Sequence, residues 1–133
     1  MDKTKEYILM CKKAEEIQKV WEHCAGDVCS PRFSDNNTWI VGFNTGFSEL
    51  KEKDIIWLPR QDQLQEMIRH KRCSQLQFED WYSELKRFTL FCGNLPACPE
   101  NYFKSMEQLW LAFVMKEKFN KKWTGNDWKK NNA

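Results

Sequence analysis

The chain has six cysteines and two histidines, the residue types that most often bind zinc. Two groups stand out, one with His23, Cys24 and Cys29 and one with Cys92 and Cys98. Four residues separate Cys24 from Cys29, which suits a zinc site, but five separate Cys92 from Cys98, and no CxxC occurs. We therefore interpret these cysteines as ordinary thiols near loops, and we expect no metal and no cofactor.

A cysteine nucleophile is a second candidate. Cys73 follows His70 within a basic segment, and neighbouring cations increase the thiolate fraction of a cysteine. Residues so close in sequence rarely form a catalytic dyad, and a basic loop between helices accounts for the same residues. We assign no catalytic residue here.

Two pairs of carboxylates lie four residues apart, Asp62 with Glu66 and Asp80 with Glu84. This spacing stacks both acids on one face of a helix, as a divalent cation or a general acid would require. Acids are also common near helix starts, where the helix dipole stabilises them. The chain has no phosphate-binding glycine loop, no HExxH and no GxSxG. A small metal-dependent hydrolase remains an alternative, but we expect no catalysis.

The most distinctive stretch, residues 54–68, reads D-I-I-W-L-P-R-Q-D-Q-L-Q-E-M-I. After the proline comes a polar row on one short predicted helix, Arg60, Gln61, Asp62, Gln63, Gln65 and Glu66. So many hydrogen-bonding groups could recognise a partner surface, or could form the solvent face of the helix. The candidates for partner binding are Arg60, Gln61, Asp62, Gln65 and Glu66.

The last part of the chain is basic, with six lysines against two acids between residues 116 and 130. Cations on phosphates combined with aromatic stacking hold single-stranded nucleic acids. The candidates for such contact are Lys118, Lys121, Lys122, Trp123 and Trp128. In the alternative interpretation, Trp123 closes the core and the lysines are solvated.

Length and composition predict one domain over residues 1–133. The net charge of +2 gives no general reason to expect a polyanion partner. No apolar run reaches the length of a membrane span, and the N-terminus does not resemble a signal peptide. We therefore expect a cytoplasmic protein with reduced cysteines and no membrane contact.

The hydrophobic patterns predict an α+β domain of about four helices on a small three-stranded antiparallel sheet. Pro59 is expected to end the last strand and begin the second helix, because proline cannot donate to a sheet but suits a first helical turn. Gly26 is expected to stop the first helix, and Pro31 to confine the first strand to an edge. The predicted helices are 4–23, 59–69, 75–93 and 105–122, and the predicted strands are 28–33, 38–43 and 55–58.

Three blocks carry a resemblance: Y-I-L-M-C-K-K-A-E-E-I-Q-K-V-W (7–21), I-W-L-P-R-Q-D-Q-L-Q-E-M (56–67) and S-M-E-Q-L-W-L-A-F-V-M (105–115). With the closing W-T-G-N-D-W, they resemble an uncharacterised family of small proteins from bacteriophages and prophages of Gram-positive bacteria. The cysteine-rich pieces 23–29 and 92–98 depart from the family pattern.

The resemblance implies an accessory protein inside an infected or lysogenic bacterial cell, and no catalytic residue comes with it. We therefore expect an adaptor that binds a phage or host protein. A nucleic-acid-binding protein and a small metal-dependent hydrolase are the alternatives.

Overall fold

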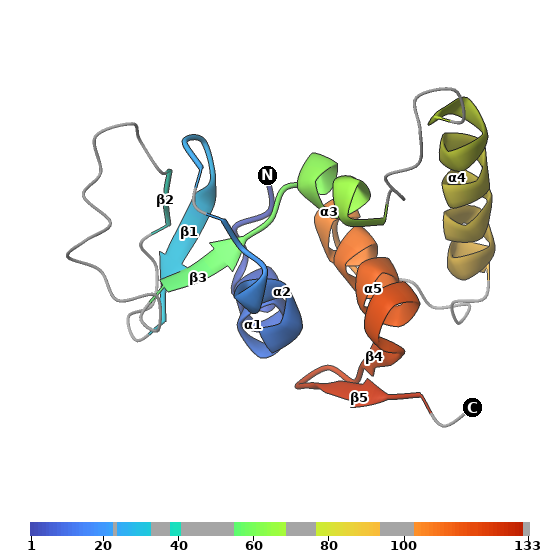
Figure 1. Ribbon diagram of the computed structural model, residues 1–133. Helices are drawn as coiled ribbons and strands as arrows, with labels where there is room; N and C mark the ends of the chain where they lie inside the picture. The colour runs from blue at the N-terminus through green and yellow to red at the C-terminus, as the bar shows by residue number, and fades with distance from the viewer. Residues whose placement is uncertain (23, 33–37, 41–54, 69–76, 94–102, 132–133) are drawn as a thin grey trace.

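The computed structural model describes residues 1–22, 24–32, 38–40, 55–68, 77–93 and 103–131 (Figure 1). Its helices are α1 (Lys5–Lys13), α2 (Glu15–Lys19), α3 (Gln61–Ile68), α4 (Gln77–Gly93) and α5 (Met106–Phe119). Its strands are β1 (Val28–Pro31), β2 (Trp39–Ile40), β3 (Ile55–Leu58), β4 (Lys121–Trp123) and β5 (Trp128–Lys130). The α+β class is confirmed.

The first sheet has the strand order β2-β1-β3, and both pairings are antiparallel. β1 is therefore the central strand, and the prediction that Pro31 would confine it to an edge is wrong. Pro31 is the last residue of β1 and pairs with Ile55, while the described pairing with β2 reaches only Val28 and Cys29. The missing N–H of Pro31 thus falls beyond the β2 ladder. The run Ser-Asp-Asn-Asn at 34–37 predicts a turn, and it lies outside the described residues.

The last strand of the first sheet ends directly before Pro59, as predicted, but the next helix does not begin at Pro59. All four residues of β3 are buried, and so is Pro59, whose carbonyl accepts a hydrogen bond of 2.5 Å from the Tyr7 hydroxyl. α3 then begins at Gln61. A buried bond from α1 therefore fixes the point where the sheet ends.

The predicted first helix is divided in two at Ala14, where φ is −84° and ψ is 69°. The apolar face is nevertheless buried as expected through Tyr7, Met10, Cys11, Ala14 and Ile17. The second helix of the pair ends at Lys19, so Gly26 is not its stop.

Gly26 instead occupies a turn before β1 with φ of 93°, a conformation that favours glycine.

The sequence S-M-E-Q at 105–108 predicts a serine cap for α5, and the Gln108 N–H donates to Ser105 Oγ at 3.1 Å as expected. The Gln108 side chain accepts from the Lys104 N–H at 3.0 Å instead of from Ser105. The apolar run of α5 is buried from Trp110 to Met115. The helix ends at Asn120, whose φ is 53°, so the prediction that it continues to Lys122 is wrong. The following residues form the β4–β5 hairpin, a second sheet of two strands that the sequence pattern did not indicate.

One cluster of buried residues joins α1, α2, β1, β3, α3, α4, α5 and β5. In α4, the Phe88 ring stacks on Trp110 of α5 at 4.0 Å between centroids. Leu85 lies three residues before Phe88, a helical spacing that predicts the same inward face, but it is 47% exposed. Among the described helices, none is both long and apolar enough to cross a membrane.

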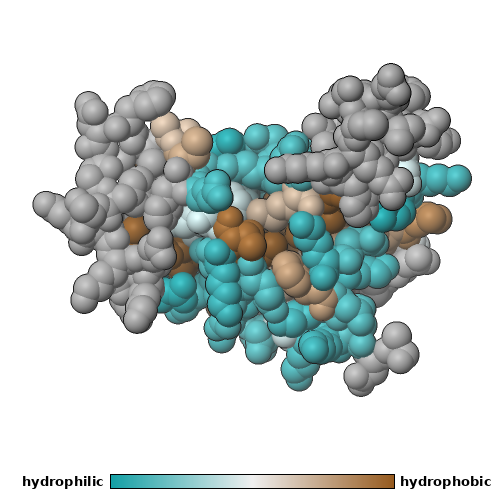
Figure 2. Space-filling view, in the orientation of Figure 1, coloured by the Kyte–Doolittle hydropathy of each residue, from teal (hydrophilic) through white to brown (hydrophobic). Residues whose placement is uncertain are grey.

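Figure 2 shows the molecule in the orientation of Figure 1, with apolar residues near the middle of the visible face. Hydrophilic residues follow the lower edge, where α1, α2 and the β4–β5 hairpin lie.

The carboxylate of Asp2 ties the N-terminal segment to the start of α5. It accepts hydrogen bonds from the Thr4 N–H at 2.8 Å, the Ser105 hydroxyl at 2.5 Å and the Gln108 amide at 2.9 Å. Burial raises the pKa of this carboxyl, but the hydrogen bonds from Ser105, Thr4 and Gln108 outweigh burial, so the pKa of Asp2 is lowered. The ionised form therefore stabilises the fold.

Asp2→Asn is expected to reduce the free energy of unfolding at neutral pH by about 1 kcal/mol, because a neutral amide cannot accept from all three donors. A lowered folded-state pKa gives stability that is present above the unfolded pKa and lost as pH falls through the folded pKa. The difference from wild type should therefore shrink below about pH 4. Urea unfolding at neutral and acidic pH measures it, with the exposed Glu15→Gln as the control. A difference that is constant over this range would contradict the assignment.

Candidate functional site

Asp27, directly before β1, is buried to 1% exposure and accepts hydrogen bonds from two chain segments. Its Oδ2 accepts from the Trp21 indole N–H at 2.8 Å and from the Cys24 backbone N–H at 3.0 Å. These two bonds fold the connection between α2 and β1 around the carboxylate. A buried carboxylate is tolerated only where such donors surround it.

The other oxygen of Asp27 contacts α3. Its Oδ1 accepts from Gln63 Nε2 at 2.6 Å and lies 3.6 Å from Arg60 Nη1. The same guanidinium nitrogen donates to the Gly26 carbonyl at 2.7 Å, and Arg60 Nε lies 3.1 Å from Asp62 Oδ1. One carboxylate therefore holds the α2–β1 connection against the first turn of α3.

Gln63 has a second role at the start of α3. Its Oε1 accepts from the Arg60 backbone N–H at 2.9 Å, the bond that an N3 glutamine makes in a capping box. Because Oε1 faces Arg60, Nε2 faces Asp27, so the orientation of the amide is defined by both partners. Helix capping and the link to Asp27 thus share one side chain.

Two parallel tryptophans stand beside this network. The rings of Trp21 and Trp57 stack with centroids 5.8 Å apart and 3° between their planes. Gln18 fixes the backbone of Trp57, because its amide accepts from Trp57 N at 2.8 Å and donates to Trp57 O at 2.9 Å. Trp57 is 4% exposed, and its indole Nε1 has no hydrogen-bond partner.

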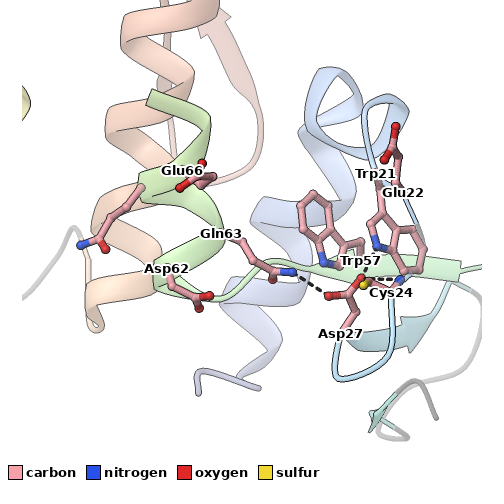
Figure 3. Close-up of a pocket in the computed structure, with 9 residues that line it drawn as sticks. Trp21, Glu22, Cys24, Asp27, Trp57, Asp62, Gln63 and Glu66 are labelled. Atoms are coloured by element: carbon pink, nitrogen blue, oxygen red, sulfur yellow. Dashed lines mark hydrogen bonds between the residues drawn. The ribbon is translucent and has the colours of Figure 1, made fainter. Parts of the chain in front are cut away.

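An open pocket of ≈ 370 Å³ lies between these indoles and α3 (Figure 3). Four of its residues are carboxylates and none is Lys, Arg or His. Figure 3 shows the Trp57 indole nitrogen turned toward Gln63 and Asp27. We call this space the Trp57 pocket; it is lined by Trp21, Glu22, Cys24, Asp27, Trp57, Asp62, Gln63, Gln65 and Glu66.

The Trp57 pocket includes three of the five residues predicted to bind a partner, Asp62, Gln65 and Glu66. Gln61 is half-buried on the same helix and is not among the lining residues. Arg60 is not among the lining residues either, and its guanidinium bonds to the Gly26 carbonyl and pairs with Asp27 and Asp62. Arg60 thus helps to hold the site together, and its contact with a partner stays a prediction.

The predicted nucleic-acid residues lie apart from this pocket, at the end of α5 and on the β4–β5 hairpin. Trp128 is 5% exposed and donates from Nε1 to the Met10 carbonyl at 2.9 Å, so its ring is unavailable for base stacking. Trp123 is half-buried against the core, and Lys121 pairs with Glu16. Only Lys118 and Lys122 of the five are exposed.

The cysteine candidates do not form a centre. Burial raises the pKa of Cys29 to about 12 and also raises the pKa of Cys11 and Cys92, which favours the protonated thiol. Cys24 is exposed at the Trp57 pocket. No group of three or more potential ligands is found in the described part of the chain. Four residues of the metal and cysteine candidates lie outside the described part of the chain: His23, His70, Cys73 and Cys98. The side chains of the carboxylate pair Asp80 and Glu84 are not described either.

Sequence reasoning missed the residues that build the site. Trp57 bonds to Gln18, and Asp27 bonds to Gln63, across long separations in the chain that no local pattern indicates. Gln63 belonged to the polar row but was not a candidate. Gln63 lies three residues after Arg60, but arginine is not a residue of the capping-box motif, so the sequence carried no clear signal for it.

Asp27→Asn is expected to reduce the free energy of unfolding by about 2 kcal/mol, because donors buried around the carboxylate would lose an acceptor. Asp62→Asn is the matched control, since Asp62 contacts the same Arg60 but its side chain is 71% exposed. Asp62→Asn should reduce the free energy of unfolding by less than about 0.5 kcal/mol. Urea unfolding of both variants measures the difference. Equal costs would mean that Asp27 does not organise the site.

We compared the chain with models of protein families, with curated proteins and with solved structures, and none of the three gave a match.

Proposed function

We propose that this chain is a non-catalytic adaptor that binds another protein through α3 and the Trp57 pocket. The observation that carries the proposal is the composition of the pocket. It joins four residues of the polar row on α3 to a pair of stacked indoles. Aromatic rings and hydrogen-bonding groups together are typical of protein interfaces.

The interior of the site also favours binding over reaction. Asp27 is surrounded by donors from Trp21, Cys24 and Gln63, so its role is to organise the pocket walls. A metal-dependent hydrolase has no supporting ligand cluster in the described segments.

Following the resemblance of the three sequence blocks, we further propose that the adaptor belongs to a phage or prophage. Its partner would then be a phage or host protein inside a bacterial cell.

The double variant Gln61→Ala/Gln65→Ala tests the α3 surface. Immobilised wild-type protein is expected to retain a partner from a Gram-positive bacterial lysate, and the double variant should retain about tenfold less, because interface contacts are lost. The matched control is Glu15→Ala/Lys19→Ala, which alters exposed residues of α2 and should leave capture unchanged. Retention of no partner, or equal retention by both variants, would contradict the proposal.

Contact with nucleic acid is a second candidate, supported by one feature of the β4–β5 hairpin. Lys122 and Lys129 are directly opposite each other and both are exposed. Like charges in this arrangement destabilise a strand pair, and a phosphate group between them would relieve the repulsion. Since Trp128 is buried, such contact would use charge without base stacking.

Lys122→Gln/Lys129→Gln tests this candidate. The wild-type protein should be retained on immobilised single-stranded DNA at low salt and released as salt rises, whereas the variant should elute at lower salt, because fewer counterions are released. Lys5→Gln/Lys13→Gln removes the same charge from exposed positions of α1 and should elute with the wild type. Failure of the wild-type protein to bind at low salt would rule the candidate out.

A further inference from the structure

We propose that the Trp57 pocket receives an arginine side chain of the partner protein. This inference rests on the proposed function and specifies what the pocket recognises. Three properties of the pocket support it: its charge, the parallel indoles and a buried donor without an acceptor.

The first property is charge. Glu22, Asp27, Asp62 and Glu66 contribute four carboxylates to the lining, and no cationic residue is among the nine. The neighbouring cation, Arg60, is held by Asp27, Asp62 and the Gly26 carbonyl. Such a surface attracts a cation from a partner.

The second property is the shape of the aromatic wall. Trp21 and Trp57 stack with 3° between their planes, and Trp57 is 4% exposed whereas Trp21 is half-buried, so Trp21 supplies most of the aromatic surface that a ligand can reach. A planar guanidinium stacks on an indole and is attracted by its ring electrons. Its donors form a fork that can reach more than one carboxylate, and Asp62 and Glu66 lie one helical turn apart on α3. An ammonium group offers neither the plane nor the fork.

The third property is the indole N–H of Trp57. It is buried, has no hydrogen-bond partner and is turned toward Gln63 and Asp27 (Figure 3). A buried donor without an acceptor is destabilising, and a ligand oxygen would satisfy it. A metal ion carries no such acceptor, whereas an arginine within a peptide has a backbone carbonyl. The volume of ≈ 370 Å³ is near the lower end of ligand pockets and suits one long side chain.

The test uses the full chain, labelled with ¹⁵N, and two blocked tripeptides, acetyl-Gly-Arg-Gly-amide and the same peptide with citrulline. Citrulline keeps the size and the carbonyl groups but has no charge. The arginine peptide should bind about tenfold more tightly than the citrulline peptide, because only the arginine peptide pairs with the carboxylates. Its binding should shift the indole N–H signal of Trp57.

Variants of the whole chain locate the binding. Glu22→Gln/Asp62→Asn removes two exposed carboxylates of the pocket and should weaken arginine-peptide binding about fivefold. Glu15→Gln removes an exposed carboxylate elsewhere and should leave it unchanged. Equal binding of both peptides would overturn the inference and would indicate a polar, uncharged occupant. Binding that is insensitive to Glu22→Gln/Asp62→Asn, or no binding, would also overturn it.

The outcomes separate this inference from the proposed function. If Gln61→Ala/Gln65→Ala abolishes partner capture but the arginine peptide does not bind, α3 is a docking surface and arginine recognition is wrong. If the peptide binds in the pocket while the wild-type protein and Gln61→Ala/Gln65→Ala capture the partner equally, arginine recognition stands. The proposal that α3 is the adaptor surface is then wrong.

Discussion

The arrangement of the site depends on one buried carboxylate. Asp27 is 1% exposed, and its two oxygens accept from different parts of the chain, Oδ2 from the α2–β1 connection and Oδ1 from α3. Burying an ionised carboxylate costs several kcal/mol unless donors replace the lost water. The donors around Asp27 therefore have to be in place together. This requirement gives the Trp57 pocket its shape, because its two walls belong to the two segments that meet at this carboxylate.

A second set of polar contacts positions β3 between these walls. The Tyr7 hydroxyl donates to the Pro59 carbonyl, and Gln18 bonds to both backbone groups of Trp57. Gln18 thus forms the hydrogen bonds to the Trp57 backbone that a neighbouring strand would otherwise form at the unpaired edge of β3. The sheet can end at β3 because a helical side chain occupies its edge. Trp57 then presents its ring to Trp21 and to α3, where the pocket lies.

Features with a short-range signal were predictable from the sequence. The apolar run before Pro59 and the serine cap of α5 each act on neighbouring residues, and both are confirmed. The break at Ala14 was missed because the apolar spacing continues through it, and only the backbone angles change. The buried contacts of Asp27 and Trp128 were missed for another reason. Their partners, Gln63 and Met10, are far away in sequence, and a single polar contact has no period.

The contacts of the N-terminal residues also determine when the fold can form. Trp128 bonds to Met10 across 118 residues, Asp2 bonds to Gln108 across 106, and Lys121 pairs with Glu16 across 105. Contacts between distant residues require large loops to close, which slows folding. During synthesis, α1 leaves the ribosome long before the hairpin that covers it. The apolar face of α1 can pack on β3 earlier, but its contacts with α5 and with Trp128 must wait for nearly the whole described chain. Until then, part of this face is exposed to chaperones and proteases.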